Sequence, residues 1–550
     1  MSSDSARGLR ARRAVLVGFA VVFVLALTAC SGFLPRPRQD VANPSDGGIS
    51  IVSLRPKQTA DLRRYYEQTV TWTKCDHSLE CGTVRVPIDW QHVGTASISL
   101  ALVKHAAKGT SLGDLLVNPG GPGGSGVGFV EDGIEGVVDG AIARSYDVIG
   151  FDPRGVGESS PVTCFDDAGT DQYFYGITPG PTGSDAWIAA ERAKAESLAA
   201  TCEKGTGPVL GHIDTINAAT DMDVIRAALG EAKLNFLGYS YGTFLGTVYA
   251  GLFPSHVGKM VLDGADDPWG ANYSPPDASD SSADFGVDPE SDGTVEQAVG
   301  FEDSLTSYLR SCLTNVTATV GGLRCPFLTS VSNAKKRVEG FLSEAAARPF
   351  AASDGRLMGD VTLATAIDDA LYDPSDWPDL THMFVQLQDR NPKVAFEFAD
   401  DYNDRNSDGT YDDNNDLANL AIGCLEEGPS VDLSFDRREA TELKKVAPVL
   451  GIYSAYGDLP CSGWKYGPSP FPNPIHAPGT GGIIVIGTTG DPATPYADAK
   501  NLAKQLDGAT LVTFHGEGHT AYDRGNQCVD DTVDAYLLNY TVPFRDPSCH

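Results

Sequence analysis

Residues 238–242 read Gly-Tyr-Ser-Tyr-Gly, so that one serine, Ser240, lies between two glycines. An apolar run at residues 234–237 precedes this pentapeptide, and a helical pattern follows it and ends before Pro254. A serine on a sharp strand-to-helix turn needs glycine on both sides, because larger side chains would clash there. The pattern therefore predicts that Ser240 is a nucleophile at the end of a strand; a purely structural glycine-rich turn is the alternative.

Short apolar segments alternate with helical segments along the chain, which is typical of an α/β sheet. Strands are predicted at residues 115–117, 146–151, 234–237, 259–262, 483–486 and 511–514, and helices at 221–229 and 529–538. Between the fourth and fifth strands lie a stretch rich in Asp, Ser, Pro and Gly and then about 150 residues of mostly helical pattern.

A serine nucleophile needs a base, and the base needs an acid that orients it. His519 lies in Gly-Glu-Gly-His-Thr, directly after the last predicted strand, and is the expected base. Asp491 follows the strand before it and is the expected acid, with Asp263, which also ends a strand, as the rival. An ordinary loop histidine and an ordinary turn aspartate are the structural alternatives.

Residues 118–124 read Asn-Pro-Gly-Gly-Pro-Gly-Gly and follow the first predicted strand. Acyl transfer requires two backbone N–H groups directed at the developing oxyanion. Tyr241, the residue after the nucleophile, is one expected donor, and Gly121 is the other, because Pro122 has no N–H. A phosphate-binding loop is disfavoured, because the lysine of such a motif is missing.

Together these features predict an α/β-hydrolase fold, with a mostly parallel central sheet and an inserted, mainly helical cap. The expected core comprises residues 61–265 and 456–550, and the acidic excursion and cap comprise residues 266–455.

The N-terminus has four arginines within residues 7–13 and then an apolar run over residues 14–29. It ends in Leu-Thr-Ala-Cys, which resembles the bacterial lipobox, so residues 1–30 are predicted to be a lipoprotein signal peptide. Cys30 would then carry the lipid, including palmitate, and residues 31–60 would form a flexible tether. The protein is expected on the outer face of the cell membrane or released from it; an uncleaved signal anchor is the alternative.

Eleven cysteines are present, and without Cys30 an even ten remain. In an exported chain this number favours disulfides over a metal site, and joining sequence neighbours in order is the simplest pairing. The formal net charge of -32 disfavours nucleic acid as a partner, because phosphate binding needs Lys and Arg. No cofactor or metal is expected.

Residues 404–409 read Asp-Arg-Asn-Ser-Asp-Gly, and Asp412 is the ninth position counted from Asp404. This matches the opening of a calcium-binding loop, but the twelfth position is Asn415 where a glutamate is needed. A solvated acidic loop is the favoured interpretation, and calcium binding is the alternative.

Several segments together resemble the tripeptidyl aminopeptidase family of exported bacterial α/β-hydrolases, relatives of the proline iminopeptidases. The matching segments are residues 81–90, 118–124, 152–157, 238–242, 421–424, 490–495 and 516–519. The resemblance implies the triad Ser240, Asp491 and His519, the oxyanion donors Gly121 and Tyr241, and release of short peptides from free N-termini. One departure is that Asn118 and Pro119 stand where iminopeptidases have the histidine of His-Gly-Gly-Pro-Gly.

An aminopeptidase must bind the ammonium of its substrate, for which a buried carboxylate is the natural partner. Glu426 and Glu427, in the helical block, are the candidates, with a solvated acidic pair as the alternative. The expected protein is a monomeric serine peptidase. A carboxylesterase or lipase, and a catalytically silent surface binding protein, are the alternative functions.

Overall fold

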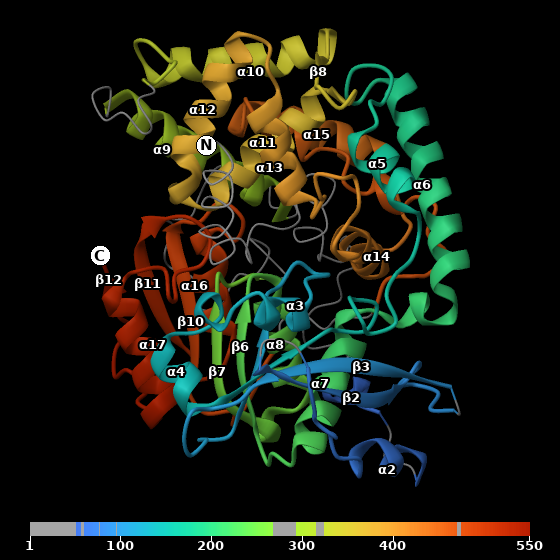
Figure 1. The fold of residues 1–550 in the computed structure, drawn as a ribbon, viewed down its shortest axis with the longest axis vertical. Coiled ribbons are helices and arrows are strands. Elements are labelled where there is room, and N and C mark those ends of the chain that lie inside the picture. The colour runs from blue at the N-terminus through green and yellow to red at the C-terminus, as the bar shows by residue number, and fades with distance from the viewer. Residues whose placement is uncertain are drawn as a thin grey trace, which may run out of the picture.

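The structure is a computed structural model that describes residues 51–56, 60–75, 78–94, 96–267, 293–314, 324–469 and 475–550 (Figure 1). The predicted signal peptide with Cys30 and most of the acidic excursion lie outside the described residues. The first described element is η1 (Ile51–Leu54), inside the segment expected to be a tether, and α2 (Ala60–Tyr66) follows it. Ile51 is buried, and a Cβ at Gly251 would lie 2.9 Å from its Cδ1, so this segment packs on the core. Among the described helices, none combines the length and the apolar character needed to cross a bilayer.

One ten-stranded sheet forms the centre of the molecule (Figure 1). Its order is β1 (Thr73–Lys74), β2 (Glu80–Pro87), β3 (Ser97–His105), β5 (Asp147–Phe151), β4 (Asp114–Asn118), β6 (Leu234–Tyr239), β7 (Val257–Asp263), β10 (Ile483–Gly490), β11 (Thr510–Glu517) and β12 (Ser548–Cys549). From β5 to β12 the neighbours are parallel, and β1, β2 and β3 add an antiparallel edge. The predicted α/β-hydrolase fold is confirmed, and the antiparallel strands are an addition that the sequence analysis missed.

Helices cover both faces of the sheet, because successive side chains of a strand point to opposite faces. In β4, Leu115 and Val117 pack in one core with side chains of α3 (Gly126–Glu131), α4 (Gly140–Ser145) and α17 (Gln527–Asn539). Leu116 packs in the other core with α7 (Thr215–Leu229), α8 (Tyr241–Leu252) and α16 (Tyr496–Gln505). A strand buried on both faces explains the continuous apolar runs in the sequence.

Helix α7 begins six residues earlier than the predicted start at residue 221. Asp214 caps it, because its Oδ1 accepts a hydrogen bond of 3.1 Å from the backbone N of Asn217. Gly230 ends it in the left-handed conformation, with φ 84°. The earlier start places Thr215 in the first turn, at the carboxyl end of the sheet.

A block of helices, here called the cap, lies between β7 and β10 in the chain (Figure 1). It contains α9 (Gly293–Thr314), α10 (Val331–Ala347), the hairpin of β8 (Phe350–Ala351) and β9 (Leu357–Met358), α11 (Asp360–Tyr372), α12 (Trp377–Gln388), α13 (Lys393–Tyr402), α14 (Asn415–Glu427) and α15 (Leu433–Val446). Helices α5 (Asp167–Tyr175) and α6 (Asp185–Thr206) come from an earlier insertion and lie beside it. The remaining short helices are η3 (Ile134–Gly136), η4 (Gly207–His212), η5 (Pro254–His256), η8 (Pro374–Asp376), η9 (Gly451–Tyr453) and η10 (Leu459–Cys461).

Five disulfides join the ten cysteines in the order that the sequence analysis predicted. The pairs are Cys75–Cys81, Cys164–Cys202, Cys312–Cys325, Cys424–Cys461 and Cys528–Cys549. The fourth pair ties α14 of the cap to the segment that leads back to the core.

Candidate active site

Ser240 lies between β6 and α8 in a strained turn, with φ 54° and ψ −129°. Both flanking positions require glycine, because a larger side chain would clash with the backbone there. A Cβ at Gly238 would lie 2.3 Å from the carbonyl O of Gly242, and a Cβ at Gly242 would lie 2.8 Å from the carbonyl O of Asn118. The backbone N of Ser240 donates a hydrogen bond of 2.9 Å to the carbonyl O of Asp263. This bond holds the turn against the carboxyl end of β7.

His519 follows β11 and faces Asp491, which follows β10. Its Nδ1 lies 2.9 and 3.0 Å from the two carboxylate oxygens, and both side chains are buried. The carboxylate of Asp491 also accepts backbone hydrogen bonds from Ala493, Thr494 and Thr520, at 3.0, 2.9 and 3.2 Å. These donors hold the carboxylate in place. The other ring nitrogen of His519, Nε2, points away from Asp491.

Asp263, the rival acid, has a different set of partners. Its carboxylate accepts hydrogen bonds from the backbone N of Ala521, at 3.1 Å, and of Tyr522, at 2.8 Å. Burial raises its pKa to about 6. Asp263 therefore holds the segment after His519, whereas Asp491 contacts the imidazole itself.

The imidazole lies close to the residue after Asp263. A Cβ at Gly264 would lie 3.0 Å from Cε1 of His519. Because Asp263 also accepts the backbone hydrogen bond of Ser240, the structure brings Ser240 and His519 to the same end of β7.

The Gly-rich loop after β4 crosses directly over the serine turn. A Cβ at Gly120 would lie 2.9 Å from Cβ of Ser240 and 3.2 Å from the backbone N of Tyr241. Gly121 follows with φ +108° and a cis peptide bond to Pro122. The structure thus places Gly120 beside Ser240, with Gly121 as the next residue of the loop, and the role of Gly121 and Tyr241 as oxyanion donors stays a prediction.

The cap contributes two contacts to this site that the sequence analysis missed. Nδ2 of Asn419, in α14, donates a hydrogen bond of 2.9 Å to the carbonyl O of Pro122. The carbonyl O of Tyr372, at the end of α11, accepts a hydrogen bond of 2.8 Å from the backbone N of His519. Both residues lie in ordinary helical patterns, so only their position in the fold distinguishes them.

The two candidate carboxylates of α14 differ in their surroundings. Oε1 of Glu426 accepts a hydrogen bond of 2.9 Å from the backbone N of Thr215 and another from its hydroxyl. The Thr215 hydroxyl also lies 2.6 Å from the hydroxyl of Tyr241, which connects Glu426 to the serine turn. Oε2 of Glu427 lies 3.9 Å from Sγ of Cys461. The structure therefore connects Glu426 to the side chain next to Ser240, and it places Glu427 beside Cys461.

Glu426 is 6% exposed, and burial raises its pKa well above the usual range. Its Oε2 has no hydrogen-bond partner among the described residues. A buried carboxylate oxygen without a donor is costly, and a substrate ammonium would supply the missing donor.

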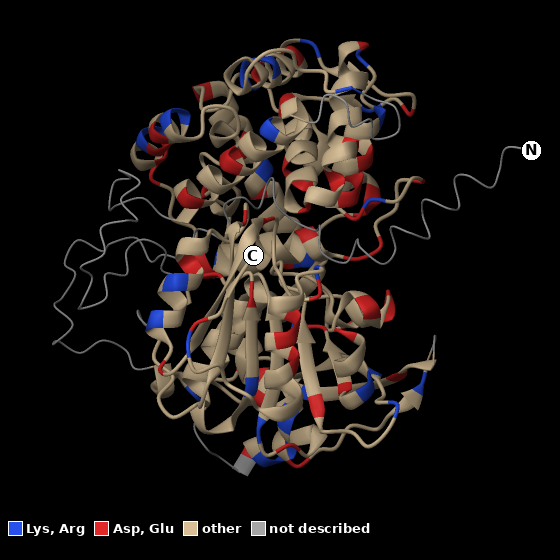
Figure 2. Ribbon diagram, turned by 90° about the vertical axis from the view of Figure 1, so that its left-hand side faces the viewer, with Lys and Arg blue, Asp and Glu red and all other residues tan. Residues whose placement is uncertain are grey.

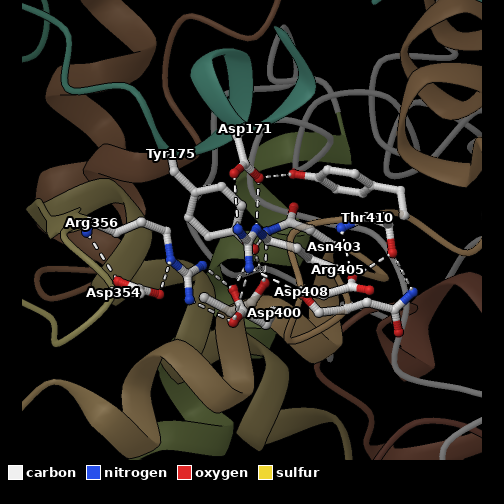
Figure 3. Close-up of polar contacts among 12 residues, drawn as sticks. Asp171, Tyr175, Asp354, Arg356, Asp400, Asn403, Arg405, Asp408 and Thr410 are labelled. Atoms are coloured by element: carbon white, nitrogen blue, oxygen red, sulfur yellow. Dashed lines mark hydrogen bonds and ion pairs between the residues drawn. The ribbon is translucent and has the colours of Figure 1, made fainter. Parts of the chain in front are cut away.

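The loop at residues 404–415, which matches the calcium motif in part, forms hydrogen bonds within itself and with neighbouring residues (Figure 3). Nδ2 of Asn406 donates to Oδ1 of Asp412 at 2.6 Å, and the backbone N of Thr410 donates to Oδ1 of Asp408 at 3.1 Å. Within the described part of the chain, the acidic side chains of this loop do not converge closely enough to hold a metal ion. The group that does converge contains Cys75 and Cys81, which form a disulfide.

Comparisons with known proteins agree with this geometry. Residues 115–311 match the family described as alpha/beta hydrolase fold, and residues 447–549 match the family described as TAP-like protein. Over 475 residues the chain is 36% identical to Carboxylesterase B of Mycobacterium tuberculosis, covering 85% of this chain and 86% of that protein. Over 498 residues it is 33% identical to Serine protease Hip1 of the same species, covering 88% and 91%.

The Tripeptidyl aminopeptidase of Streptomyces lividans is 31% identical over 485 residues, which are 86% of this chain and 83% of that protein. The chain is therefore a serine hydrolase, and it belongs to the tripeptidyl aminopeptidase-like family of α/β-hydrolases, as its motifs predicted.

Proposed function

We propose that this protein is an exported serine peptidase that releases short peptides, expected to be tripeptides, from free N-termini. Similarity to a tripeptidyl aminopeptidase and to a serine protease supports a peptide substrate. The observation that carries the requirement for a free N-terminus is the buried Oε2 of Glu426, which has no donor among the described residues.

In the proposed mechanism, Oγ of Ser240 attacks the scissile carbonyl carbon, and Nε2 of His519 takes the hydroxyl proton. Asp491 holds the imidazole through Nδ1, in the contact that the structure shows at 2.9 Å. Backbone N–H groups of Gly121 and Tyr241 stabilise the oxyanion. His519 then donates its proton to the leaving amine, and water hydrolyses the acyl-enzyme in the reverse sequence of proton transfers.

Glu426 defines where the substrate begins. An ammonium bound to its free oxygen would lie beside the Thr215 hydroxyl, which contacts the side chain of Tyr241. The N-terminus would then be held at a constant distance from Ser240, and that distance sets the number of residues released. The cap would then supply the group that binds the N-terminus, since Glu426 belongs to α14.

Export and membrane attachment remain proposals that rest on residues 1–30. We propose that Cys30 is acylated after cleavage of the signal peptide, which leaves the folded part tethered to the outer face of the membrane. Mass spectrometry of the mature N-terminus tests this proposal. A diacylated Cys30 supports it, and an intact residue 1 contradicts it.

A carboxylesterase is the second candidate function, because Carboxylesterase B is 36% identical to this chain. The same serine, histidine and oxyanion donors would serve an ester, so the site itself does not separate the two reactions. An esterase, however, has no need of a carboxylate partner for an ammonium.

The test compares kcat/KM of the full-length protein for tripeptide anilides with a free amine, for the same anilides acetylated, and for short p-nitrophenyl esters. We expect the free amine to be preferred by at least about tenfold, because an ammonium brings a charged donor to the buried carboxylate and an acetylated amine does not. Glu426→Gln should lose this preference, and the matched variant Glu427→Gln should keep it.

Ser240→Ala should abolish all turnover and labelling by a fluorophosphonate. Ester turnover without anilide cleavage would reject the peptidase in favour of the esterase. A free-amine preference that survives Glu426→Gln would reject the assignment of Glu426.

A further inference from the structure

A cavity of about 1120 Å³ lies between the Gly-rich loop and the cap. Gly120 and Gly121 line one side of it, and residues from the connection between α13 and α14 line the other. The two sides are in contact at Gly123, where a Cβ would lie 2.4 Å from the carbonyl O of Asn415. The cavity therefore adjoins the position in which we expect the substrate carbonyl.

The charge of the cavity is strongly one-sided. Of the described residues that line it, twelve are Asp or Glu, and Arg405 is the one Lys or Arg. Figure 2 shows the same bias, with more Asp and Glu than Lys and Arg where the cap faces the core.

Arg405 does not compensate this charge, because it is already paired. Its Nε and Nη2 donate to the two carboxylate oxygens of Asp171, at 2.6 and 2.9 Å (Figure 3). The neighbouring Asp400 is paired as well, with Nη2 of Arg356 at 2.8 Å. These two ion pairs hold the wall together, and among the described residues that line the cavity they leave no Lys or Arg to pair with Asp416.

Two buried acceptors in the lining have unused hydrogen-bonding capacity. Asp416, in the first turn of α14, is 8% exposed and forms no hydrogen bond or ion pair through its side chain with any described residue. Asn415 is 5% exposed, and its Oδ1 likewise has no partner within the described part of the chain. Its Nδ2 donates to Oδ2 of Asp404 at 3.2 Å. At these two positions the lining therefore offers acceptors that no described donor uses.

A ligand for this lining must carry positive charge and several N–H donors. An anion is excluded by the carboxylates, and a metal ion is disfavoured because no three of the described acidic side chains here lie close enough to share one. Burial and Asp413 raise the pKa of Asp416 well above the usual range, and a cation in the cavity would favour its ionised form. An ammonium or guanidinium group satisfies both requirements.

We propose that this cavity is a specificity subsite that receives a lysine or arginine side chain of the substrate, with Asp416 as the carboxylate that meets its charge. This inference rests on the proposed peptide substrate. It assigns to the enzyme a preference for peptides that carry a basic residue near the scissile bond. The subsite is separate from Glu426, which lies at the opposite end of α14 and does not line the cavity.

The test uses the full-length protein with tripeptide anilides. Tetrapeptides replace the anilides when the residue after the scissile bond is varied. Lysine and norleucine, which have similar length and differ in charge, are exchanged at each position in turn. We expect lysine to be preferred by at least about tenfold at one position. Asp416→Asn should bring the lysine-to-norleucine ratio close to one, as should Asp404→Asn if the first variant folds poorly.

Asp507→Asn removes the same charge from an exposed position outside the cavity and should keep the ratio. A ratio near one at every position in the wild type, or an unchanged ratio in both cavity variants, would overturn the proposal. So would a loss of the free-amine preference in Asp416→Asn in place of the lysine preference, because the cavity would then hold the N-terminus.

Failure of the peptidase proposal is distinguished with esters. If no peptide is cleaved, the p-nitrophenyl esters of Nα-acetyl-lysine and Nα-acetyl-norleucine are compared in the same variants. A lysine preference lost in Asp416→Asn then supports the subsite on an esterase, and equal turnover of the two esters rejects it.

Discussion

The carbonyl O of Tyr372 accepts a hydrogen bond of 2.8 Å from the backbone N of His519, and the rings of the two residues meet edge to face with their centroids 5.5 Å apart. Tyr372 ends α11 of the cap, whereas His519 follows a strand of the core. The expected base is therefore positioned from the core by Asp491 and from the cap by Tyr372. This contact makes the cap part of the support of the site as well as its cover.

Replacing Tyr372 by alanine should lower kcat/KM by about tenfold, because the imidazole loses a packing partner that restricts its orientation. The ring also packs against Phe301, with centroids 5.4 Å apart, so some loss of thermal stability is expected too. Tyr372→Phe keeps the ring and serves as the control. The decisive readout is the split between kcat and KM: kcat should fall in the alanine variant with KM unchanged, and neither should change in the phenylalanine variant. An unchanged kcat in the alanine variant would show that Tyr372 has only a structural role.

Asp491→Asn and Asp263→Asn separate the two aspartates that the sequence analysis left as rivals. Loss of the Asp491 carboxylate should lower kcat by about 10⁴-fold, the cost typical of removing the acid that orients a catalytic imidazole. Asp263→Asn should lower the melting temperature and reduce kcat far less, because Asp263 holds the backbone of Ala521 and Tyr522. Steady-state kinetics and thermal denaturation of both variants check this ordering, and a reversed order of the kcat losses would assign Asp263 as the acid.

Gly120→Ala should abolish activity, because the added Cβ would lie 2.5 Å from the carbonyl O of Tyr239 and 2.9 Å from Cβ of Ser240. The loop would have to move away from the serine and take Gly121 with it. Gly508→Ala is the matched control, since Gly508 also has positive φ but nothing within 4 Å of the added atom. Labelling by a fluorophosphonate measures the effect directly. Normal labelling of Gly120→Ala would show that this loop does not shape the oxyanion site.

The burial of Asp266 should make the free energy of unfolding depend on pH. It is 5% exposed, and burial together with Asp267 raises its pKa to about 8. An unfolded aspartate titrates near 3.9, so the native state binds this proton more tightly than the unfolded state does. The contribution of Asp266 to the free energy of unfolding is therefore full below about pH 4 and is lost as the pH rises through about 8.

Asp266→Asn stays neutral at every pH and should remove this dependence. The melting temperature of the variant relative to the wild type should rise between about pH 5 and 8 and level off above about pH 9. Asp507→Asn, at an exposed position, should show a flat difference. A flat difference for Asp266→Asn as well would mean that Asp266 is already ionised at pH 5.

Much of this protein was predictable from short stretches of sequence. The serine turn needs glycine at residues 238 and 242 for local steric reasons, so its motif is readable without a fold. The parallel strands are buried on both faces and appear as continuous apolar runs. The sequence analysis did not recognise the antiparallel strands β2 and β3 or the insertion that carries α5 and α6. These segments have neither a motif nor an isolated apolar run of that kind.

Sequence alone determined the family, the fold class, the order of the disulfides and the identity of the candidate serine, histidine and leading acid, because each depends on contiguous residues. Tertiary structure decided which of two strand-ending aspartates contacts His519, since both lie at the same edge of the sheet. It also decided that Glu426 turns toward Thr215 while Glu427 turns toward Cys461. The acidic cavity joins residues from about 119 to 417, far apart in the chain, and such a surface exists only when packing brings its walls together.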